Sequence, residues 1–260
     1  MIGDAQITRV LVLGGTTEAA QLCKLMAASP RITGTLSLAG RTAKPASQPL
    51  PMRIGGFGGA EGLERYLTEQ KIDILVDATH PFAEQISINA KAAARRANVF
   101  LIMLTRVAWT KVAGDRWMEV NDLTEAAEAL GKIPRRVLLT SGRLGLAAFE
   151  SAPQHNYVIR TIDPPETLNL PRAKILLDRG PFSESAEHAL MLAEKIEVLV
   201  TKNSGGSATY GKIAAARMLG LPVVMVRPPV RSGTLTLHDP MDALSVIEAH
   251  HSGTGMDRGV

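Results

Sequence analysis

A turn on two glycines near the start of the chain is the first segment whose residue types could bind a ligand. The apolar residues 10–13 lead into Gly14, Gly15, Thr16, Thr17 and Glu18, after which the composition is that of a helix. A strand that turns through glycine into a helix presents backbone N–H groups and the positive end of the helix dipole, so it can bind a phosphate. The spacing departs from the G-x-G-x-x-G pattern of dinucleotide sites. A turn in which Thr16 or Thr17 merely caps the helix is therefore the alternative.

The next predicted strand ends on an arginine. Residues 33–39 alternate as a strand does and lead into Gly40-Arg41-Thr42. In dinucleotide-binding folds the tip of the second strand lies beside the adenosine ribose, where an acidic residue selects NAD and an arginine accommodates the 2′-phosphate of NADP. Arg41, with Thr42, therefore predicts a preference for NADPH. A solvated loop arginine is the alternative.

Predicted strands and helices alternate along the first 107 residues, and the strands are almost continuously apolar. This pattern predicts a parallel sheet covered on both faces, in which ligands bind at the carboxyl ends of the strands. Glycine or polar residues follow all five predicted strands, at 14–18, 40–42, 55–59, Thr79-His80-Pro81-Phe82 and Thr105-Arg106. The four glycines of 55–59 allow a backbone to approach a cofactor closely or form a flexible loop, and both interpretations stay open. The agreement among the five strand ends favours a nucleotide site.

The second half of the chain repeats the alternation, but its predicted strand ends carry cations. Arg143 follows Thr140-Ser141-Gly142, Arg179 follows Asp178, and Lys202 precedes Asn203-Ser204-Gly205-Gly206. Guanidinium and ammonium groups beside serines and glycine-flanked backbone suit several carboxylates better than one pyrophosphate. We therefore expect a second ligand site here. For each cation taken singly, a solvated surface charge is the alternative.

The sequence gives weaker evidence for other kinds of catalytic or metal site. The segment from Gly206 to Lys212 matches the start of a phosphate-binding P-loop, but Ile213 stands where the Ser or Thr that ligates Mg²⁺ is required. The six histidines lack metal-ligand spacing, so no metal site is predicted. The single cysteine, Cys23, lies in an apolar helical segment and is expected to be a buried core thiol.

Length and composition indicate a globular protein, since 260 residues with 45% hydrophobic side chains can bury a sizeable core. The net charge is only +4, and ten aromatic residues (two Trp, three Tyr and five Phe) form no pattern interleaved with a basic stripe, which argues against nucleic-acid binding. No apolar run approaches the roughly 20 residues needed to cross a bilayer. The N-terminus also lacks the basic and apolar regions of a signal peptide. We expect a cytoplasmic protein without membrane contact.

The alternation lapses near residues 107–116, and we place a domain boundary there. The prediction is a first domain over residues 1–107, a second over residues 108–248 and a flexible tail over residues 249–260. The fold class is α/β, with mainly parallel sheets.

Five motifs in this order resemble the precorrin-6A reductase family of cobalamin biosynthesis, over roughly residues 8–230. They are Gly14 to Ala19, Ala78 to Ala83, Thr140 to Arg143, Asp178 to Phe182 and Thr201 to Gly206. The resemblance implies two Rossmann-like three-layer α/β/α domains with a cleft between them. It also implies that NADPH is held by the first domain and that precorrin-6A, a tetrapyrrole with many carboxylates, is held by the second.

The reaction implied is reduction of one macrocycle double bond to give precorrin-6B, with a hydride from the nicotinamide and a proton to the neighbouring carbon. The implied cofactor residues are Gly14, Gly15, Thr16, Thr17 and Glu18 at the pyrophosphate, Arg41 and Thr42 at the 2′-phosphate, and Thr79, His80, Pro81 and Phe82 beside the nicotinamide. The implied carboxylate-binding residues are Ser141, Gly142, Arg143, Arg179, Lys202, Asn203, Ser204, Gly205 and Gly206. Lys202 is the candidate proton donor or electrostatic stabiliser, because desolvation after a buried strand lowers a lysine pKa. A carboxylate anchor is the alternative role for Lys202.

Two other functions remain open at this point. The first is cobalt-precorrin-6A reductase, which uses NADH or NADPH and whose substrate differs by a bound metal. The second is a module that senses NADPH without catalysis, although the polar strand ends of the second half argue for a second ligand. The sequence leaves the oligomeric state open; a monomer is compatible with it, as are transient contacts with neighbouring pathway enzymes.

Overall fold

The computed structural model describes residues 7–40, 47–230 and 233–250, and the chain forms two compact units. The first unit consists of the described residues of Met1–Arg106 and Pro229–Val260, and the second unit is Val107–Pro228. Each unit contains one six-stranded sheet in which all neighbouring strands are parallel. This architecture confirms the predicted α/β class with two Rossmann-like sheets.

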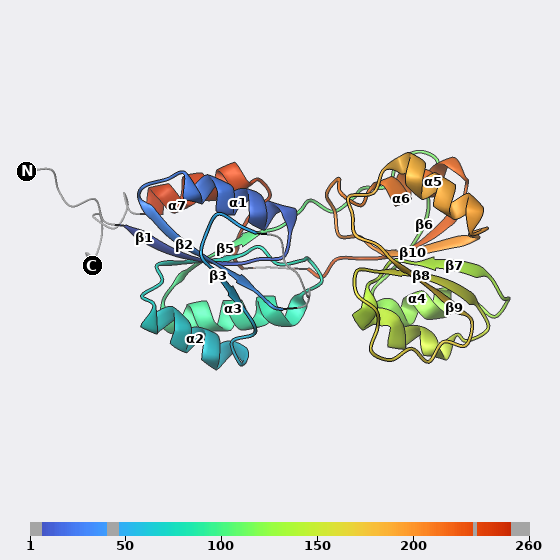
Figure 1. Cartoon of the computed structure of the whole chain (residues 1–260), viewed down its shortest axis with the longest axis horizontal. Coiled ribbons are helices and arrows are strands. Elements are labelled where there is room, and N and C mark those ends of the chain that lie inside the picture. The colour runs from blue at the N-terminus through green and yellow to red at the C-terminus, as the bar shows by residue number, and fades with distance from the viewer. Residues whose placement is uncertain (1–6, 41–46, 231–232, 251–260) are drawn as a thin grey trace, which may run out of the picture. The chain divides into compact units, whose positions relative to one another are not determined.

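The first unit has the strand order of dinucleotide-binding folds. The chain adds β2 and β3 on one side of β1, and then β4 and β5 on its other side. Its sheet has the order β12-β5-β4-β1-β2-β3. The strands are β1 (Thr8–Leu13), β2 (Ile32–Leu38), β3 (Met52–Ile54), β4 (Ile74–Asp77), β5 (Phe100–Leu104) and β12 (Leu235–Leu237). One face is covered by α1 (Thr17–Ala27) and α7 (Pro240–His250), and the other by α2 (Gly59–Glu69) and α3 (Glu84–Ala97) (Figure 1).

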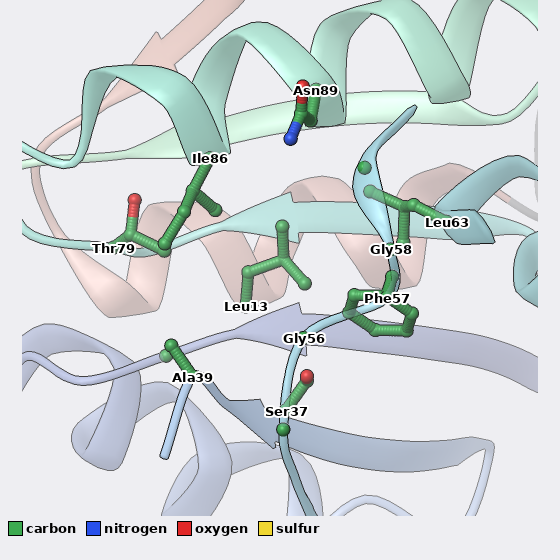
Figure 2. Close-up of a pocket in the computed structure, with 13 residues that line it drawn as sticks. Leu13, Ser37, Ala39, Gly56, Phe57, Gly58, Leu63, Thr79, Ile86 and Asn89 are labelled. Carbon is green, nitrogen blue, oxygen red and sulfur yellow. The ribbon is translucent and has the colours of Figure 1, made fainter. Parts of the chain in front are cut away.

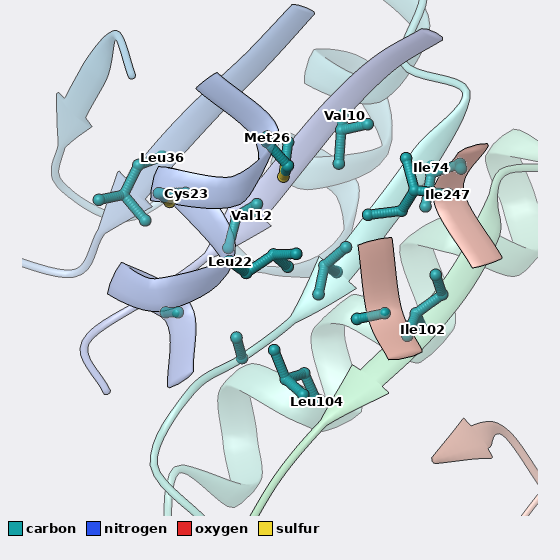
Figure 3. Packing of buried hydrophobic residues seen from close by; sticks show 14 of the residues in the cluster. Val10, Val12, Leu22, Cys23, Met26, Leu36, Ile74, Ile102, Leu104 and Ile247 are labelled. Carbon is teal, nitrogen blue, oxygen red and sulfur yellow. The ribbon is translucent and has the colours of Figure 1, made fainter. Parts of the chain in front are cut away.

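Strand β1 forms the centre of this unit because both of its faces are buried. Val10 and Val12 pack against Leu22 and Met26 of α1 (Figure 3), while Leu11 and Leu13 face the cluster formed with α2 and α3. Cys23 lies in the α1 core, and burial raises the pKa of its thiol to about 11. The predicted core thiol is confirmed, and such a pKa makes it a poor nucleophile at neutral pH.

The second unit repeats the same neighbour order, except that its outermost strand comes first in the chain. Its sheet has the order β6-β11-β10-β7-β8-β9. The strands are β6 (Arg116–Val120), β7 (Arg136–Leu139), β8 (Asn156–Thr161), β9 (Ala173–Leu177), β10 (Val198–Lys202) and β11 (Pro222–Val226). The helices are α4 (Leu123–Ala129), the 3₁₀ helix η1 (Arg143–Ser151), α5 (Glu184–Ala193) and α6 (Gly211–Met218), with α5 and α6 on one face (Figure 1).

The predicted extent of the second domain is wrong at its C-terminal end. Residues 229–248 were expected there, but β12 pairs with β5, and the Thr105 N–H donates to the Leu237 carbonyl at 3.0 Å. Ala243 and Ile247 of α7 are buried in the β1 and α1 core. The chain therefore returns to the first unit, because this apolar helix face and edge strand complete that core. Most of the predicted tail, residues 251–260, lies outside the described residues.

None of the helices in the described ranges combines the length and the apolar character that a membrane-spanning helix requires.

Candidate functional site

A cavity of about 160 Å³ lies at the carboxyl ends of β1 to β4, on the side of the sheet covered by α2 and α3 (Figure 2). In open parallel sheets ligands bind at the carboxyl ends of the two neighbouring strands at which the strand order reverses. In this sheet those strands are β1 and β4. Ile86 and Asn89 extend from α3 toward the sheet, opposite Leu13 (Figure 2). The lining consists of Leu13, Gly14, Ser37, Ala39, Gly55, Gly56, Phe57, Gly58, Gly59, Leu63, Thr79, Ile86 and Asn89. An apolar cavity of about 150 Å³ accommodates benzene, so this one can take a flat ring.

The glycine-rich loop 55–59 forms one wall of the cavity and is fixed by Arg53. The Arg53 guanidinium donates to the Gly55 carbonyl at 3.0 Å, the Gly56 carbonyl at 3.2 Å and the Ser37 hydroxyl at 2.7 Å. It also lies 3.7 Å from the centroid of the Phe57 ring. The hydrogen bonds fix the loop at two carbonyls, and its glycines face open space at the cavity, as the interpretation of close approach by a cofactor requires. Arg53 was not predicted, because its role depends on strand pairing with Ser37.

The β1–α1 turn is capped by Thr16. Its hydroxyl accepts from the Ala19 N–H at 3.2 Å and donates to the Ala78 carbonyl at 2.8 Å. Thr16 is therefore the N-cap of α1, and its hydrogen bonds tie the turn to the end of β4. Gly15 has a φ of +125°, which favours glycine. The backbone N–H groups of the turn, rather than the Thr16 hydroxyl, are the groups suited to a phosphate.

Arg106, at the end of β5, reaches the N-terminus of α1 and was missed as a site residue. Its Nε donates to Glu18 Oε2 at 2.8 Å and its Nη2 to Thr17 Oγ1 at 3.0 Å. The Arg106 and Glu18 side chains are 13% and 17% exposed. The sequence shows a polar strand end at Thr105-Arg106, but no local pattern indicates a contact that spans 88 residues. The structure thus places a cation beside the predicted phosphate turn.

Thr79 is the predicted nicotinamide residue that lines the cavity. Its N–H and hydroxyl both donate to Asp77 Oδ1, at 3.1 and 2.6 Å, and both residues are buried. His80 is exposed, and its Nδ1 accepts from the Phe82 N–H at 3.2 Å. His80, Pro81 and Phe82 follow Thr79 but are not part of the lining. Arg41 and Thr42 lie outside the described residues.

In the second unit, the predicted carboxylate-binding residues gather at the ends of β7 and β10. The two strands are neighbours, with Val200 opposite Leu139 and the Thr140 N–H donating to the Val200 carbonyl at 3.0 Å. This pairing brings the segments Thr140 to Arg143 and Lys202 to Gly206 to the point where the strand connections diverge. Arg179 follows the edge strand β9 and is exposed. The segment that carries it continues to Phe182, whose N–H donates to the Ala208 carbonyl at 3.1 Å.

Two buried hydroxyls at this edge have unused hydrogen-bonding capacity. The hydroxyl oxygens of Ser141, after β7, and Thr161, at the end of β8, have no hydrogen-bond partner among the described residues. Leu139 and Ile159 are paired, so the two hydroxyls follow adjacent strands at the same level. Thr161 was not predicted as a site residue. The sequence feature that could have indicated it is a threonine at the end of a predicted strand.

The Asn203 side chain is committed to Trp109. Asn203 Oδ1 accepts from the Trp109 N–H and Asn203 Nδ2 donates to the Trp109 carbonyl, both at 2.8 Å. The Trp109 indole N–H donates to the Gly206 carbonyl at 2.7 Å. Ser204 is buried, and Gly205 and Gly206 have φ values of +64° and +74°. Asn203 therefore shapes the loop that follows β10, since both polar atoms of its amide are occupied.

The segment from Gly206 to Lys212, which matches the start of a P-loop, does not place its lysine where it could bind a phosphate. Lys212 is buried, and its Nζ lies 5.2 Å from the centroid of the Trp109 ring. Ile213, in the position that requires Ser or Thr, is fully buried in the core of the second unit. These contacts agree with the prediction that the segment is not a kinase or ATPase loop.

Comparisons with known proteins agree with the five sequence motifs. The sequence model of a family described as "Precorrin-6x reductase CbiJ/CobK" matches residues 9–248. A precorrin-6A reductase from Sinorhizobium sp. is 54% identical over 84% of this chain and 84% of its own length. A solved structure of "CobK precorrin-6A reductase" is 44% identical, with a TM-score of 0.89 over 98% of this chain and 100% of that one. A cobalt-precorrin-6A reductase from Priestia megaterium is 28% identical over 87% of this chain and 93% of its own length. Because the match extends over both units, the chain belongs to the precorrin-6x reductase family CbiJ/CobK.

Proposed function

We propose that this protein reduces one macrocycle double bond of precorrin-6A with NADPH, giving precorrin-6B. The observation that carries the proposal is the family match over residues 9–248. The reductase from Sinorhizobium sp. is nearly twice as similar, at 54% identity, as the cobalt-precorrin-6A reductase from Priestia megaterium, at 28%. This difference favours the metal-free substrate over the cobalt-bound one.

The first unit is proposed to bind the dinucleotide. Gly15 and Thr17 at the N-terminus of α1 provide backbone N–H groups for the pyrophosphate, and Arg106 adds a positive charge beside them. The Gly14 N–H already donates to the Ser37 carbonyl at 2.9 Å, so Gly14 contributes the close backbone approach rather than a donor. The cavity beside loop 55–59 has the size and apolar lining for the adenine ring, and it includes Ser37 near the tip of β2, where the ribose is expected. Arg41 and Thr42 are proposed for the 2′-phosphate, and His80 to Phe82 for the nicotinamide end. Thr79 lines the proposed adenine cavity and is therefore assigned to its wall instead.

The second unit is proposed to bind the acidic tetrapyrrole. Arg143 and Lys202 at the neighbouring ends of β7 and β10 supply charge for carboxylates, and the unpartnered hydroxyl of Ser141 can donate to one. Gly142, Ser204, Gly205 and Gly206 offer backbone groups, and Arg179 is proposed to bind a more distant acid side chain. When NADPH is bound, its nicotinamide supplies the hydride. Lys202 is proposed to donate the proton or to stabilise developing charge.

Titration with NADPH and NADH tests the cofactor assignment. The wild-type protein should bind NADPH in preference to NADH. Arg106→Ala should raise the Kd for NADPH about tenfold or more, because it removes a charged donor beside the phosphate turn. Arg96→Ala is the matched control, since Arg96 is an exposed cation of the same unit, paired with Glu64. Binding of neither nucleotide would contradict a reductase, and binding without turnover of precorrin-6A would support a sensing module instead.

Steady-state kinetics of Lys202→Met test the proton-donor role. Loss of a general acid should lower kcat by about 10²-fold or more, whereas loss of a carboxylate anchor should raise KM with kcat unchanged. Lys132→Met, which removes an exposed lysine of the second unit, is the control and should leave both constants unchanged. If Lys202→Met raised KM alone, Lys202 would be reassigned to substrate binding.

A further inference from the structure

Lys212 is a buried amine that the proposed reaction does not use. It lies in the first turn of α6, and the residue is 5% exposed. Its Nζ faces the Trp109 ring, 5.2 Å from the ring centroid. No hydrogen bond to this amine is found within the described residues. A lysine is rarely buried without a paired partner, so the burial of Lys212 needs a physical explanation.

The charged groups around Lys212 come from two other elements. Arg160 of β8 and Glu187 of α5 form a buried ion pair, with Arg160 Nη2 donating to Glu187 Oε2 at 3.0 Å. The Arg160 guanidinium also lies 3.7 Å from the centroid of the Phe182 ring. Burial lowers the pKa of Lys212 to about 7; repulsion from Arg160 acts in the same direction, and attraction to Glu187 opposes it. The amine therefore changes charge near neutral pH.

Trp109 connects Lys212 to the loop that follows β10. The backbone of Trp109 forms two hydrogen bonds with Asn203, and its indole forms a third with Gly206. The Tyr210 ring packs edge-on against it at 5.8 Å, and Arg217 Nη2 donates to the Tyr210 hydroxyl at 2.6 Å. A cation over an indole attracts the ring, and the attraction disappears when the amine is neutral. The charge of Lys212 thus acts on the residue that fixes the loop.

We propose that Lys212 is a positioning residue whose positive charge holds Trp109, and through it the loop 203–206, in place. The loop is held firmly while Lys212 is charged and loosens when it loses its proton. The assignment of this loop to substrate binding rests on the proposed function, whereas the coupling between Lys212 and Trp109 does not.

Tryptophan fluorescence of the ligand-free protein tests the coupling. The chain has two tryptophans, so Trp117→Phe leaves Trp109 as the single fluorophore. Its emission should change between pH 5.5 and 9 with a midpoint near 7, and the transition should be absent in Trp117→Phe variants that also carry Lys212→Met or Lys212→Arg. His188 lies on α5 next to Glu187, so His188→Gln is the control and should keep the transition. A flat profile in Trp117→Phe, or a transition that persists without Lys212, would overturn the proposal.

Stability against pH is a second measurement that does not depend on fluorescence. The folded-state pKa of about 7 lies below the ordinary value of 10.5, so between these values the unfolded chain binds a proton that the folded chain does not. Stability should therefore rise with pH across this window. Lys212→Met should remove the rise, and Lys212→Arg, which stays charged, should also remove it. An unchanged rise in both variants would contradict a buried, titrating Lys212.

Kinetics then connect the coupling to the substrate. In the wild type, KM for the tetrapyrrole should rise about twofold to thirtyfold above the same midpoint, the range of a cation–π contact, while kcat at saturation stays constant. Lys212→Arg should show a KM without this transition. A fluorescence transition without a KM transition would keep the coupling and reject the substrate role of the loop. Absence of any turnover would reject the proposed function and leave the fluorescence result standing.

Discussion

Gly62→Ala is expected to lower the free energy of unfolding by about 1–3 kcal/mol, the usual cost of overpacking, and to abolish most NADPH binding. A Cβ at residue 62 would lie 1.6 Å from the Phe57 carbonyl oxygen and 2.8 Å from its carbonyl carbon. Both atoms belong to the backbone, so relief requires the loop 55–59 to move. That loop lines the cavity. Thermal unfolding and NADPH titration of the same sample measure both effects.

Gly56→Ala is the matched control for this prediction. Gly56 belongs to the same loop, but a Cβ there would meet no atom within 4 Å. The free energy of unfolding should therefore stay within about 0.5 kcal/mol of the wild type, as for surface substitutions. Equal stabilities for Gly62→Ala and Gly56→Ala would show that the contact between Phe57 and Gly62 does not fix the loop.

Glu187→Gln is expected to lower the free energy of unfolding of the second unit by about 3–5 kcal/mol, because one partner of a buried ion pair is lost. Arg160 and Glu187 are 6% and 1% exposed. Without the carboxylate, the Arg160 guanidinium remains buried without its counter-charge, and Lys212 loses the attraction that opposes its desolvation. Chemical denaturation followed by circular dichroism measures the change.

Glu64→Gln provides the comparison for an exposed pair. Arg96 and Glu64 are 3.4 Å apart, and their side chains are 47% and 35% exposed. Solvent screens such a pair, so its loss should cost about 0–1 kcal/mol. The double variant Arg160→Met with Glu187→Leu should recover much of the stability lost in Glu187→Gln, because it removes both buried charges. Similar losses for Glu187→Gln and Glu64→Gln would show that the Arg160 pair is effectively solvated.

The sequence by itself determined the features that depend on neighbouring residues. Apolar strands that end in glycine or polar residues, followed by helical segments, predicted two parallel α/β sheets and their ligand-facing edges. The turn at Gly14 and Gly15 could be located because two glycines between an apolar strand and a helical segment indicate a tight turn. The family followed from five motifs of this kind, all of them at strand ends.

The tertiary structure alone decided which distant segments meet. The return of β12 and α7 to the first unit depends on pairing with β5 and packing against α1, and no local pattern encodes that choice. The contact of Arg106 with Glu18 joins residues 88 positions apart, and that of Asn203 with Trp109 joins residues 94 positions apart. Hydrophobic periodicity reports which face of an element is buried, but not which element covers it. The partners of these side chains, and hence their roles, therefore emerge only when the chain is folded.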